Sequence, residues 1–535
     1  MSAAGPPQGA RPPCGGRRRE ATLRGEPMTA AGPPQGARPP VGGGGAKRRY
    51  GGRSSTAGPP QGARPASAPP FAIAEVECFE RPVTLRLPFR FGSATVREAP
   101  QAFVRARIVA PDGKGATGMA AELMIPKWFD KDPARDNARN VDDLRGALRA
   151  AAEAYTSERA SAGAFEHASR HYRALLEAGT RAGRNALTSS YGPALVDRAV
   201  LDALCRWQGM AFAAAVRANR VGLDARLTPD LAGFALDGFL AALPARRSIA
   251  ARHTIGLVDP LDDDTPESLR AIIARYGHRY FKIKLGGDVD ADVARLAAIA
   301  SVLDSMHDYA VTFDGNEQFA DVAAVRALHD AVTRNPSLRR LARSVLYLEQ
   351  PLARAATLDI DVSGAAGDWP LLIDEADDTL DAFPRARRRG YAGVSSKSCK
   401  GVYKSLLNAA RCAQANALHE PPSPFVSGED LTSQAGIAVQ QDLSLVTLLG
   451  LAHVERNGHH YVDGFAGQGA GRHERQAFVA AHPDLYVQDG DNVRLRITAG
   501  EIRCGSLDMT GFGADVTPDP ASLTPLSLHG TAALS

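Results

Sequence analysis

The hydrophobic and polar positions change their period along the chain. Between residues 71 and 123 apolar and polar residues alternate in segments bounded by turn residues, and Pro-Asp-Gly-Lys-Gly at 111–115 marks a hairpin. From 140 to 222 the spacing becomes helical, most clearly in 195–220. This part of the chain is therefore predicted to form strands followed by helices.

From about Ser248 short apolar strands alternate with helices. Strands are predicted at 252–259, 280–285, 309–314, 344–351, 370–374 and 392–397, with helical patterns such as 265–279 and 290–306 between them. Repeated β-α units at this spacing imply parallel strands joined by helical crossovers. On this pattern alone, a closed barrel and an open doubly wound sheet both fit.

Two lysines lie one residue apart in the strand predicted at 280–285. Because side chains alternate along a strand, Lys282 and Lys284 face one side, while Phe281 and Ile283 face the other. On an edge strand the lysines would be ordinary solvated charges. In the wall of a barrel they would converge on a site.

The strands that follow also end in charged residues. Asp314, Glu349 and Asp374 end three successive strands, and Lys397 ends the next one. A buried charge is costly without a partner, and the carboxyl ends of barrel strands meet at one face. The three carboxylates would there form a set of hard oxygen ligands, which suits Mg²⁺. The pattern as a whole therefore favours a barrel with a metal site.

The lysines suggest a chemistry for that site. Lys284 and Lys397 would approach a metal-bound substrate from opposite sides. Removal of a proton next to a carboxylate creates an enediolate, whose developing charge a metal can stabilise. Partial burial and the neighbouring ammonium of Lys282 are expected to lower a lysine pKa and make the amine usable as a base. Lys282 could also bind the substrate carboxylate.

The order of these motifs resembles the enolase superfamily. The chain carries Lys-x-Lys at 282–284, Asp-x-Asn at 314–316, Glu-Gln-Pro at 349–351, Asp-Glu at 374–375 and Lys-x-x-Lys at 397–400. Because lysines stand on both sides of the carboxylates, the chain resembles the muconate lactonizing enzyme-like subgroup of the mandelate racemase/muconate lactonizing enzyme type. The resemblance extends from about Ala72 to the end of the folded chain.

The resemblance implies an α/β fold with four parts. These are a disordered Gly/Pro/Arg tail (1–70), an α+β capping domain with linking helices (71–245), a modified (β/α)7β TIM-type barrel (246–465), and a C-terminal segment that packs on the cap and frays at its end (466–535). Segments 87–96 and 117–133 look like the two specificity loops of the cap.

The resemblance also implies a role for each motif residue. Asp314, Glu349 and Asp374 correspond to the Mg²⁺ ligands, Lys284 and Lys397 to the acid/base pair, and Lys282 to a helper. The implied activity is Mg²⁺-dependent abstraction of the α-proton of a carboxylate, leading to racemisation or epimerisation, cycloisomerisation, or β-elimination. A catalytically inactive, enolase-like binding protein is the alternative. A phosphoryl-transfer or hydrolase barrel would need a phosphate-gripping glycine loop, for which Lys-Leu-Gly-Gly-Asp at 284–288 is too weak a signal.

Three features depart from the family pattern. One glycine, Gly401, follows the Lys397 motif where a pair is usual, and the interval from Asp314 to Glu349 is long. Residues 453–464 contain no Asp-x-Asp of the kind that holds an α-ammonium group, which weighs against a dipeptide substrate.

Several other residues are given expected positions. Phe89, Phe91 and Trp128 are expected to form an apolar wall, with Arg90 facing a distal anion, and Glu429 and Asp430 either to shape the pocket or to cap a helix. Glu375 is expected to point into a helix start, and Lys400 to be solvated. The His-rich stretch 455–460 is interpreted as a polar loop over the barrel.

Composition narrows the partners. The 535 residues include 63 Lys and Arg against 59 Asp and Glu, and this near balance does not favour nucleic acid. The first seventy residues repeat Ala-Gly-Pro-Pro-Gln-Gly-Ala-Arg-Pro three times, which predicts disorder. Six scattered cysteines and the lack of a long apolar run or a secretory h-region suggest a cytoplasmic protein with reduced thiols. We expect a small-molecule carboxylate substrate, a homo-oligomer, and neither nucleic acid nor membrane as partner.

Overall fold

The computed structural model describes residues 68–91, 94–262 and 264–526. These residues belong to one compact unit of the chain, Arg64–Ser535. The predicted tail, 1–70, lies outside the described residues except for its last three positions, and the predicted frayed end lies outside them from residue 527 onward.

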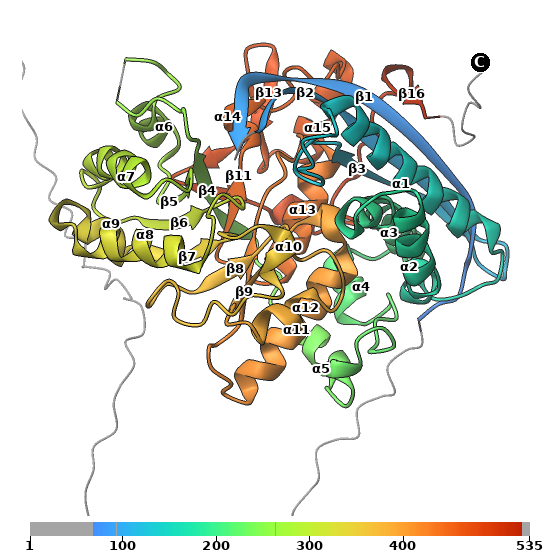
Figure 1. The fold of residues 1–535 in the computed structure, drawn as a ribbon. Coiled ribbons are helices and arrows are strands. Elements are labelled where there is room, and N and C mark those ends of the chain that lie inside the picture. Colours follow the sequence, from blue (N-terminus) through green and yellow to red (C-terminus); the bar gives the residue numbers. More distant parts are fainter. Residues whose placement is uncertain (1–67, 92–93, 263, 527–535) are drawn as a thin grey trace, which may run out of the picture. The chain divides into compact units, whose positions relative to one another are not determined.

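An antiparallel sheet and three long helices form the N-terminal part. Strands β1 (Ala72–Phe91), β2 (Ala94–Val109) and β3 (Gly115–Leu123) are joined by β16 (Thr524–Pro525) in the order β16-β1-β2-β3. Helices α1 (Asn137–Ser157), α2 (Ala164–Arg181) and α3 (Ala186–Gln208) pack beside this sheet (Figure 1). The prediction of an α+β capping domain is confirmed.

The caps of these helices follow from local sequence. The Asp136 side chain accepts a hydrogen bond from the backbone N–H of Arg139 at the start of α1, and Asn185 does the same for Thr188 at the start of α3. Gly209 ends α3 in the left-handed conformation (φ 62°), which costs glycine little.

The second part is a closed barrel of eight parallel strands. The strands are β4 (Ser248–Ile255), β5 (Tyr280–Lys284), β6 (Ala310–Asp314), β7 (Val345–Glu349), β8 (Leu371–Ile373), β9 (Gly393–Ser396), β10 (Phe425–Gly428) and β11 (His453–Arg456). Each pairs with the next in sequence, and β11 pairs with β4 to close the ring. The predicted closed barrel is thus confirmed over the open sheet.

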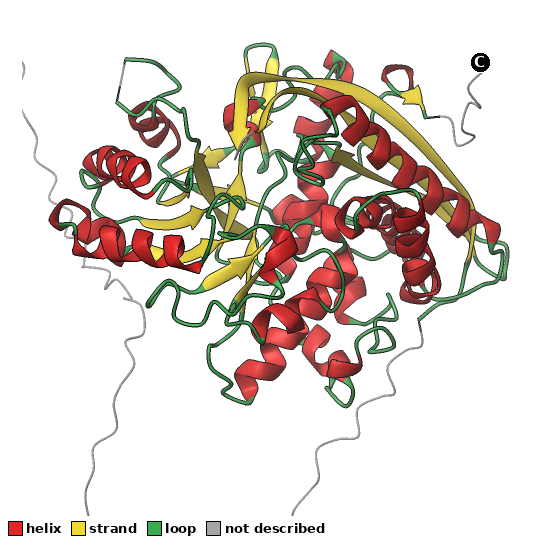
Figure 2. Ribbon diagram, viewed as in Figure 1, coloured by secondary structure: helices red, strands yellow, loops and turns green. Residues whose placement is uncertain are grey.

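Helices connect these strands on the outside of the barrel (Figures 1 and 2). They are α6 (Leu269–Tyr276), α7 (Val289–Leu303), α8 (Val322–Arg334), α9 (Arg339–Arg343), α10 (Arg354–Thr357), α11 (Ala382–Arg387), α12 (Val402–Ala417) and α13 (Ile437–Leu448), preceded by α4 (Phe212–Arg217) and α5 (Leu236–Ala241). Seven β-α units are followed by a last strand, which is the predicted (β/α)7β order.

The C-terminal segment returns along the barrel to the cap. It contains α14 (Gly458–Tyr461), α15 (Arg472–Ala481), β12 (Tyr486–Asp489), β13 (Asn492–Leu495), β14 (Ile497–Thr498) and β15 (Glu501–Arg503). Strand β15 pairs antiparallel with β4, and β16 pairs with β1. The segment therefore contacts both the barrel wall and the cap sheet.

Two cap segments reach the mouth of the barrel, and their structure refines the predicted loops. Residues 87–91 and 94–96 belong to the paired ends of β1 and β2, so the first segment is a hairpin. Residues 117–123 belong to β3, and only 124–133 form a loop. That loop docks on the barrel because Arg354 donates to the backbone oxygens of Trp128 and Phe129, both at 2.9 Å.

The cysteines and helices of the described residues add two findings. Cys78, Cys205, Cys399, Cys412 and Cys504 are free and buried. None of the helices in the described ranges is long and apolar enough to cross a membrane.

Candidate active site

The charged residues predicted at the strand ends lie at one level of the barrel. Lys284 at the end of β5 pairs in register with Asp314 at the end of β6, and Asp314 pairs with Glu349 at the end of β7. Asp374 and Lys397 directly follow β8 and β9. All five side chains are buried, so the barrel gathers these charges at the carboxyl ends of its strands.

Lys282 lies at the centre of a cluster of carboxylates. Its Nζ is 2.9 Å from Asp314, 2.8 Å from Glu349, 2.9 Å from Glu429 and 3.1 Å from Glu455. One ammonium is thus shared by four carboxylates from four different strand ends. Two of these carboxylates, those of Asp314 and Glu349, belong to residues that the sequence predicted for the site.

The electrostatics of this cluster correct one expectation. Burial lowers the pKa of Lys282, but the attraction of the four carboxylates outweighs it and holds the pKa well above its usual value. Burial likewise lowers the pKa of Lys397, but the negative charge of Asp374 raises it by more, so the net shift is upward. The surrounding carboxylates therefore stabilise both amines as ammonium ions. A neighbouring lysine was expected to lower the pKa, but the carboxylates raise it by more.

Lys284 and Lys397 face each other across the barrel mouth. Strands β5 and β9 are four positions apart in a closed ring of eight, which places their ends on opposite sides. Lys284 Nζ lies 2.7 Å from Asp314 Oδ2, and Lys397 Nζ lies 2.6 Å from Asp374 Oδ2. Each lysine is thus anchored by one of the predicted metal ligands.

The cap contributes an aromatic side chain next to each lysine. The Trp128 ring centroid lies 4.3 Å from Lys397 Nζ, and the Phe89 centroid lies 6.0 Å from Lys284 Nζ. Together with Ile125 they form the apolar part of a small cavity. Its polar lining consists of Lys282, Lys284, Asp314, Asn316, Lys397, Asp430, Thr432, Glu455 and Asn457. The remaining lining residue is the apolar Leu431.

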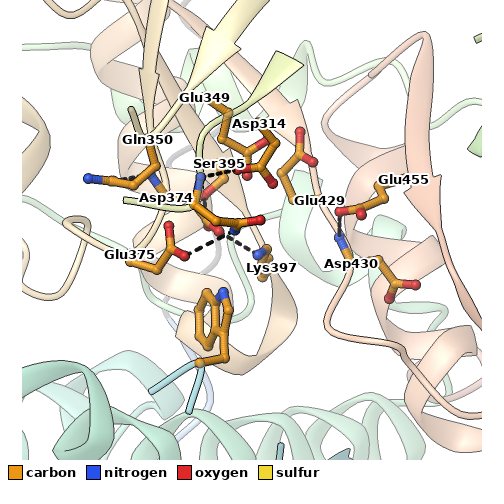
Figure 3. Close-up of polar contacts among 12 residues, drawn as sticks. Asp314, Glu349, Gln350, Asp374, Glu375, Ser395, Lys397, Glu429, Asp430 and Glu455 are labelled. Atoms are coloured by element: carbon orange, nitrogen blue, oxygen red, sulfur yellow. Dashed lines mark hydrogen bonds and ion pairs between the residues drawn. The ribbon is translucent and has the colours of Figure 1, made fainter. Parts of the chain in front are cut away.

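Asp374 is held by several donors (Figure 3). Besides Lys397, it accepts a hydrogen bond from Ser395, and Lys400 Nζ lies 3.6 Å from its Oδ1. Burial raises the pKa of Asp374, but Lys397 and Lys400 outweigh this and keep it below its usual range. The expectation of a solvated Lys400 is wrong, because this lysine is buried and paired with Asp377 at 2.9 Å.

Glu375 does not point into a helix start as expected. It is fully buried, and its Oε1 accepts a hydrogen bond from Asn316 Nδ2 at 3.3 Å. Lys131, from the cap loop, lies 3.4 Å from the same oxygen and 2.9 Å from Glu317. The ion pairs of Lys131 with Glu317 and Glu375 therefore bind the cap loop to the barrel.

Sequence reasoning did not assign Glu455 to the site, and it left Glu429 open between shaping the pocket and capping a helix. Glu429 follows β10 directly and Glu455 lies in β11, so they complete the series of acids at strand ends. The recurrence of acids at strand ends was the sequence signal that could have identified both glutamates as site residues. Glu455 was missed because 455–460 was interpreted as a polar loop, whereas His459 and His460 are buried.

The donor set fits a divalent cation such as Mg²⁺. The predicted ligands Asp314, Glu349 and Asp374 are carboxylates, which hard cations prefer. Figure 3 shows them projecting from neighbouring strand ends toward a common region. Burial, with the charges of Asp314 and Glu429 next, raises the pKa of Glu349 well above its usual value. The neighbouring acids therefore disfavour the ionised form of Glu349, and a bound cation would favour it.

Comparisons with known proteins agree with this architecture. Residues 264–465 match the family model described as enolase C-terminal domain-like. A mandelate racemase/muconate lactonizing enzyme structure from Roseovarius nubinhibens ISM shares the fold, with 17% identity, a TM-score of 0.54, and coverage of 85% of this chain and 99% of that chain. No curated protein matches the sequence significantly.

Two further solved structures were determined with ligands. A muconate lactonizing enzyme from Pseudomonas fluorescens, complexed with muconolactone, is 17% identical with a TM-score of 0.52 and coverage of 84% and 98%. An enolase from Bradyrhizobium, complexed with magnesium and mandelic acid, is 14% identical with a TM-score of 0.53 and coverage of 85% and 97%. The family model thus covers the barrel, and these solved structures share the two-part fold of cap and barrel with this chain.

Proposed function

We propose that this protein is a Mg²⁺-dependent enzyme that removes the α-proton of a small carboxylate substrate. The observation that carries the proposal is the placement of Lys284 and Lys397. Both are buried, both line one cavity, and they project from opposite strands of the barrel. A substrate carbon between them would have an amine on each face.

Asp314, Glu349 and Asp374 would hold the metal ion. When bound, Mg²⁺ supplies positive charge that favours the ionised substrate carboxylate and the negative charge that develops on it. Lys282, which already contacts the first two of these carboxylates, would keep them oriented and add positive charge beside the substrate.

The lysines would carry the proton. In its free amine form, one lysine takes the α-proton, and the electron pair of the C–H bond moves into the carboxylate to give an enediolate. Return of a proton from the opposite lysine gives the epimer. Loss of a β-leaving group gives an alkene instead, and attack or release within the substrate gives cycloisomerisation.

The cavity suggests the substrate's size and polarity. Phe89, Ile125 and Trp128 enclose the site from the cap side. They would exclude water and contact an apolar group next to the acid. The muconolactone and mandelic acid found in two related structures are small molecules of this kind. We therefore place the substrate among small organic acids.

Deuterium exchange tests the reaction class directly. Acid sugars, amino-acid derivatives and cycloisomerase substrates would be incubated with the protein and Mg²⁺ in heavy water, and deuterium at the α-carbon followed by mass spectrometry. We expect Mg²⁺-dependent incorporation that is lost in Glu349→Gln and kept in Glu420→Gln, a surface control. Mg²⁺ binding without incorporation into any of these acids would favour the inactive binding protein.

A further inference from the structure

Three histidines from distant parts of the chain converge in the interior. His253 lies in β4, His278 precedes β5, and His459 lies in α14. All three are buried, and one ring nitrogen of each lies within 4.8 Å of one ring nitrogen of the other two. The stretch that the sequence presented as a polar loop thus supplies part of a closed cluster.

This cluster is separate from the carboxylate cavity. On β4, Arg252 pairs with Glu429 and Thr254 donates to Glu455, so these two side chains point into the barrel. Because side chains alternate along a strand, His253 points to the outside of the wall. The histidines therefore occupy the space between the outer face of β4 and α14.

The ring nitrogens of the cluster are incompletely paired. His278 Nδ1 lies 3.1 Å from the backbone oxygen of Ala251 and so carries the proton, which leaves the lone pair of Nε2 without a partner. His253 Nδ1 and His459 Nε2 lie 3.2 Å apart. A backbone carbonyl that fixes one nitrogen while the other stays free is the usual environment of a metal-binding histidine.

Burial keeps these rings neutral. It lowers the pKa of His278 to about 4 and the pKa values of His253 and His459 well below their usual range, and neighbouring histidines add to the effect on all three. At neutral pH each ring therefore offers a lone pair, as metal binding requires.

We propose that His253, His278 and His459 form a second metal site, which takes Zn²⁺. Imidazole nitrogen suits Zn²⁺, whereas Mg²⁺ prefers oxygen, so the two sites differ in donor chemistry. The nearest histidine, His460, has its ring centroid 5.1 Å from that of His253 and lacks hydrogen-bond partners at both nitrogens. A fourth position would be filled by His460 or by a water molecule.

The site has a structural role in holding α14. Asn457, just before this helix, lines the catalytic cavity. Tyr461 at its end packs against Phe89 with ring centroids 4.3 Å apart, and Arg86 donates to the backbone oxygen of His460 at 2.7 Å. A metal bound to His459 would fix the surface on which the cap hairpin rests.

Cobalt spectroscopy tests the proposal. Chelator-treated protein would be given excess Mg²⁺ to fill the carboxylate site and then titrated with Co²⁺. We expect one Co²⁺ per chain with the intense visible absorption of a tetrahedral nitrogen site, displaced by Zn²⁺. His278→Gln and His459→Gln should lose this absorption. His167→Gln should keep it, since His167 is equally buried but lies in α2 of the cap, outside the three-histidine cluster.

Two results would overturn the site. One is wild-type protein without the absorption, and the other is absorption that persists in both variants. If the variants fail to fold, X-ray absorption of Zn²⁺-loaded wild-type protein decides. Three imidazole nitrogens at about 2.0–2.1 Å support the proposal, and a shell of carboxylate oxygens refutes it. This outcome is independent of whether the protein exchanges α-protons.

Discussion

At the scale of single residues, burial and a few neighbours decide which side chains carry charge. The carboxyl group of Asp197, in α3, shows this away from the catalytic cavity. Burial raises its pKa to about 7, although the hydrogen bond from the Tyr155 hydroxyl, 2.7 Å away, acts in the opposite direction. The folded protein therefore keeps a proton here that the unfolded chain loses near its usual pKa of 3.8.

This difference predicts a pH-dependent stability. Between about pH 4 and 7 the folded state binds more protons at Asp197, so its contribution to stability falls as pH rises. Asp197→Asn keeps the acceptor for Tyr155 and removes the titration. We expect the variant to be about 2–4 kcal/mol more stable than wild type at pH 8, with little difference at pH 4.

Urea denaturation at the two pH values measures the effect. Asp368→Asn, at an exposed position, serves as the control and should follow wild type. A variant at Asp197 whose stability falls with pH as steeply as that of wild type would show that this carboxyl group does not titrate as described.

The residue scale also shows where sequence reasoning ends. The gathering of Lys284 and Lys397 at one cavity could be predicted because each stands at the end of an apolar strand, and Lys282 because it shares a strand face with Lys284. Their partners could not, because Lys282 takes carboxylates from four strands that are distant in sequence. The pKa of Lys282 is raised because these four carboxylates surround its ammonium group.

At the scale of elements, the loop 124–133 is the main connection between cap and catalytic cavity. It carries Trp128 and is anchored by Lys131, whose Nζ donates to the Asn316 backbone oxygen at 2.7 Å and contacts Glu317 and Glu375. The family resemblance implied a specificity loop at 117–133, and 124–133 is the part of that segment that lies outside β3. Its anchors were not predictable, since they belong to loops after β6 and β8.

Lys131→Met should therefore impair catalysis more than folding. Loss of charge-assisted hydrogen bonds would free the loop and displace Trp128 from Lys397. Since such bonds are worth about 1.5–3 kcal/mol, we expect kcat/KM to fall by about 10- to 100-fold. Hydrogen exchange of 124–133 should be faster. Lys114→Met, in the exposed β2–β3 turn, is the control, and equal losses in both variants would argue against the anchor.

At the scale of the whole molecule, repeated strand-helix units and charged strand ends were enough to favour a closed barrel, and the family resemblance added the cap. The sequence did not reveal that β15 pairs with β4 or that β16 completes the cap sheet, because these short strands have little periodicity of their own. The histidine cluster was missed for a similar reason. His253, His278 and His459 meet only after the ring of strands has closed.

The proposed Mg²⁺ site at Asp314, Glu349 and Asp374 predicts that Mg²⁺ stabilises the whole fold. A cation that binds only the native state stabilises it by about 2.7 kcal/mol at a concentration 100 times its Kd. We expect Tm to rise with Mg²⁺ concentration and to fall in chelator, and Glu349→Gln to lose this dependence. Differential scanning calorimetry measures it. A Tm indifferent to Mg²⁺ in the wild-type protein would contradict binding at this site.

The most direct measurement of the account follows the α-proton on each face of the substrate carbon. Exchange with deuterium from heavy water would be compared in Lys284→Ala and Lys397→Ala, using substrates of both configurations at that carbon and saturating Mg²⁺. The two-lysine site predicts that each variant loses exchange for one configuration and keeps it for the other, with opposite preferences. Equal residual exchange of both configurations in the two variants would contradict it.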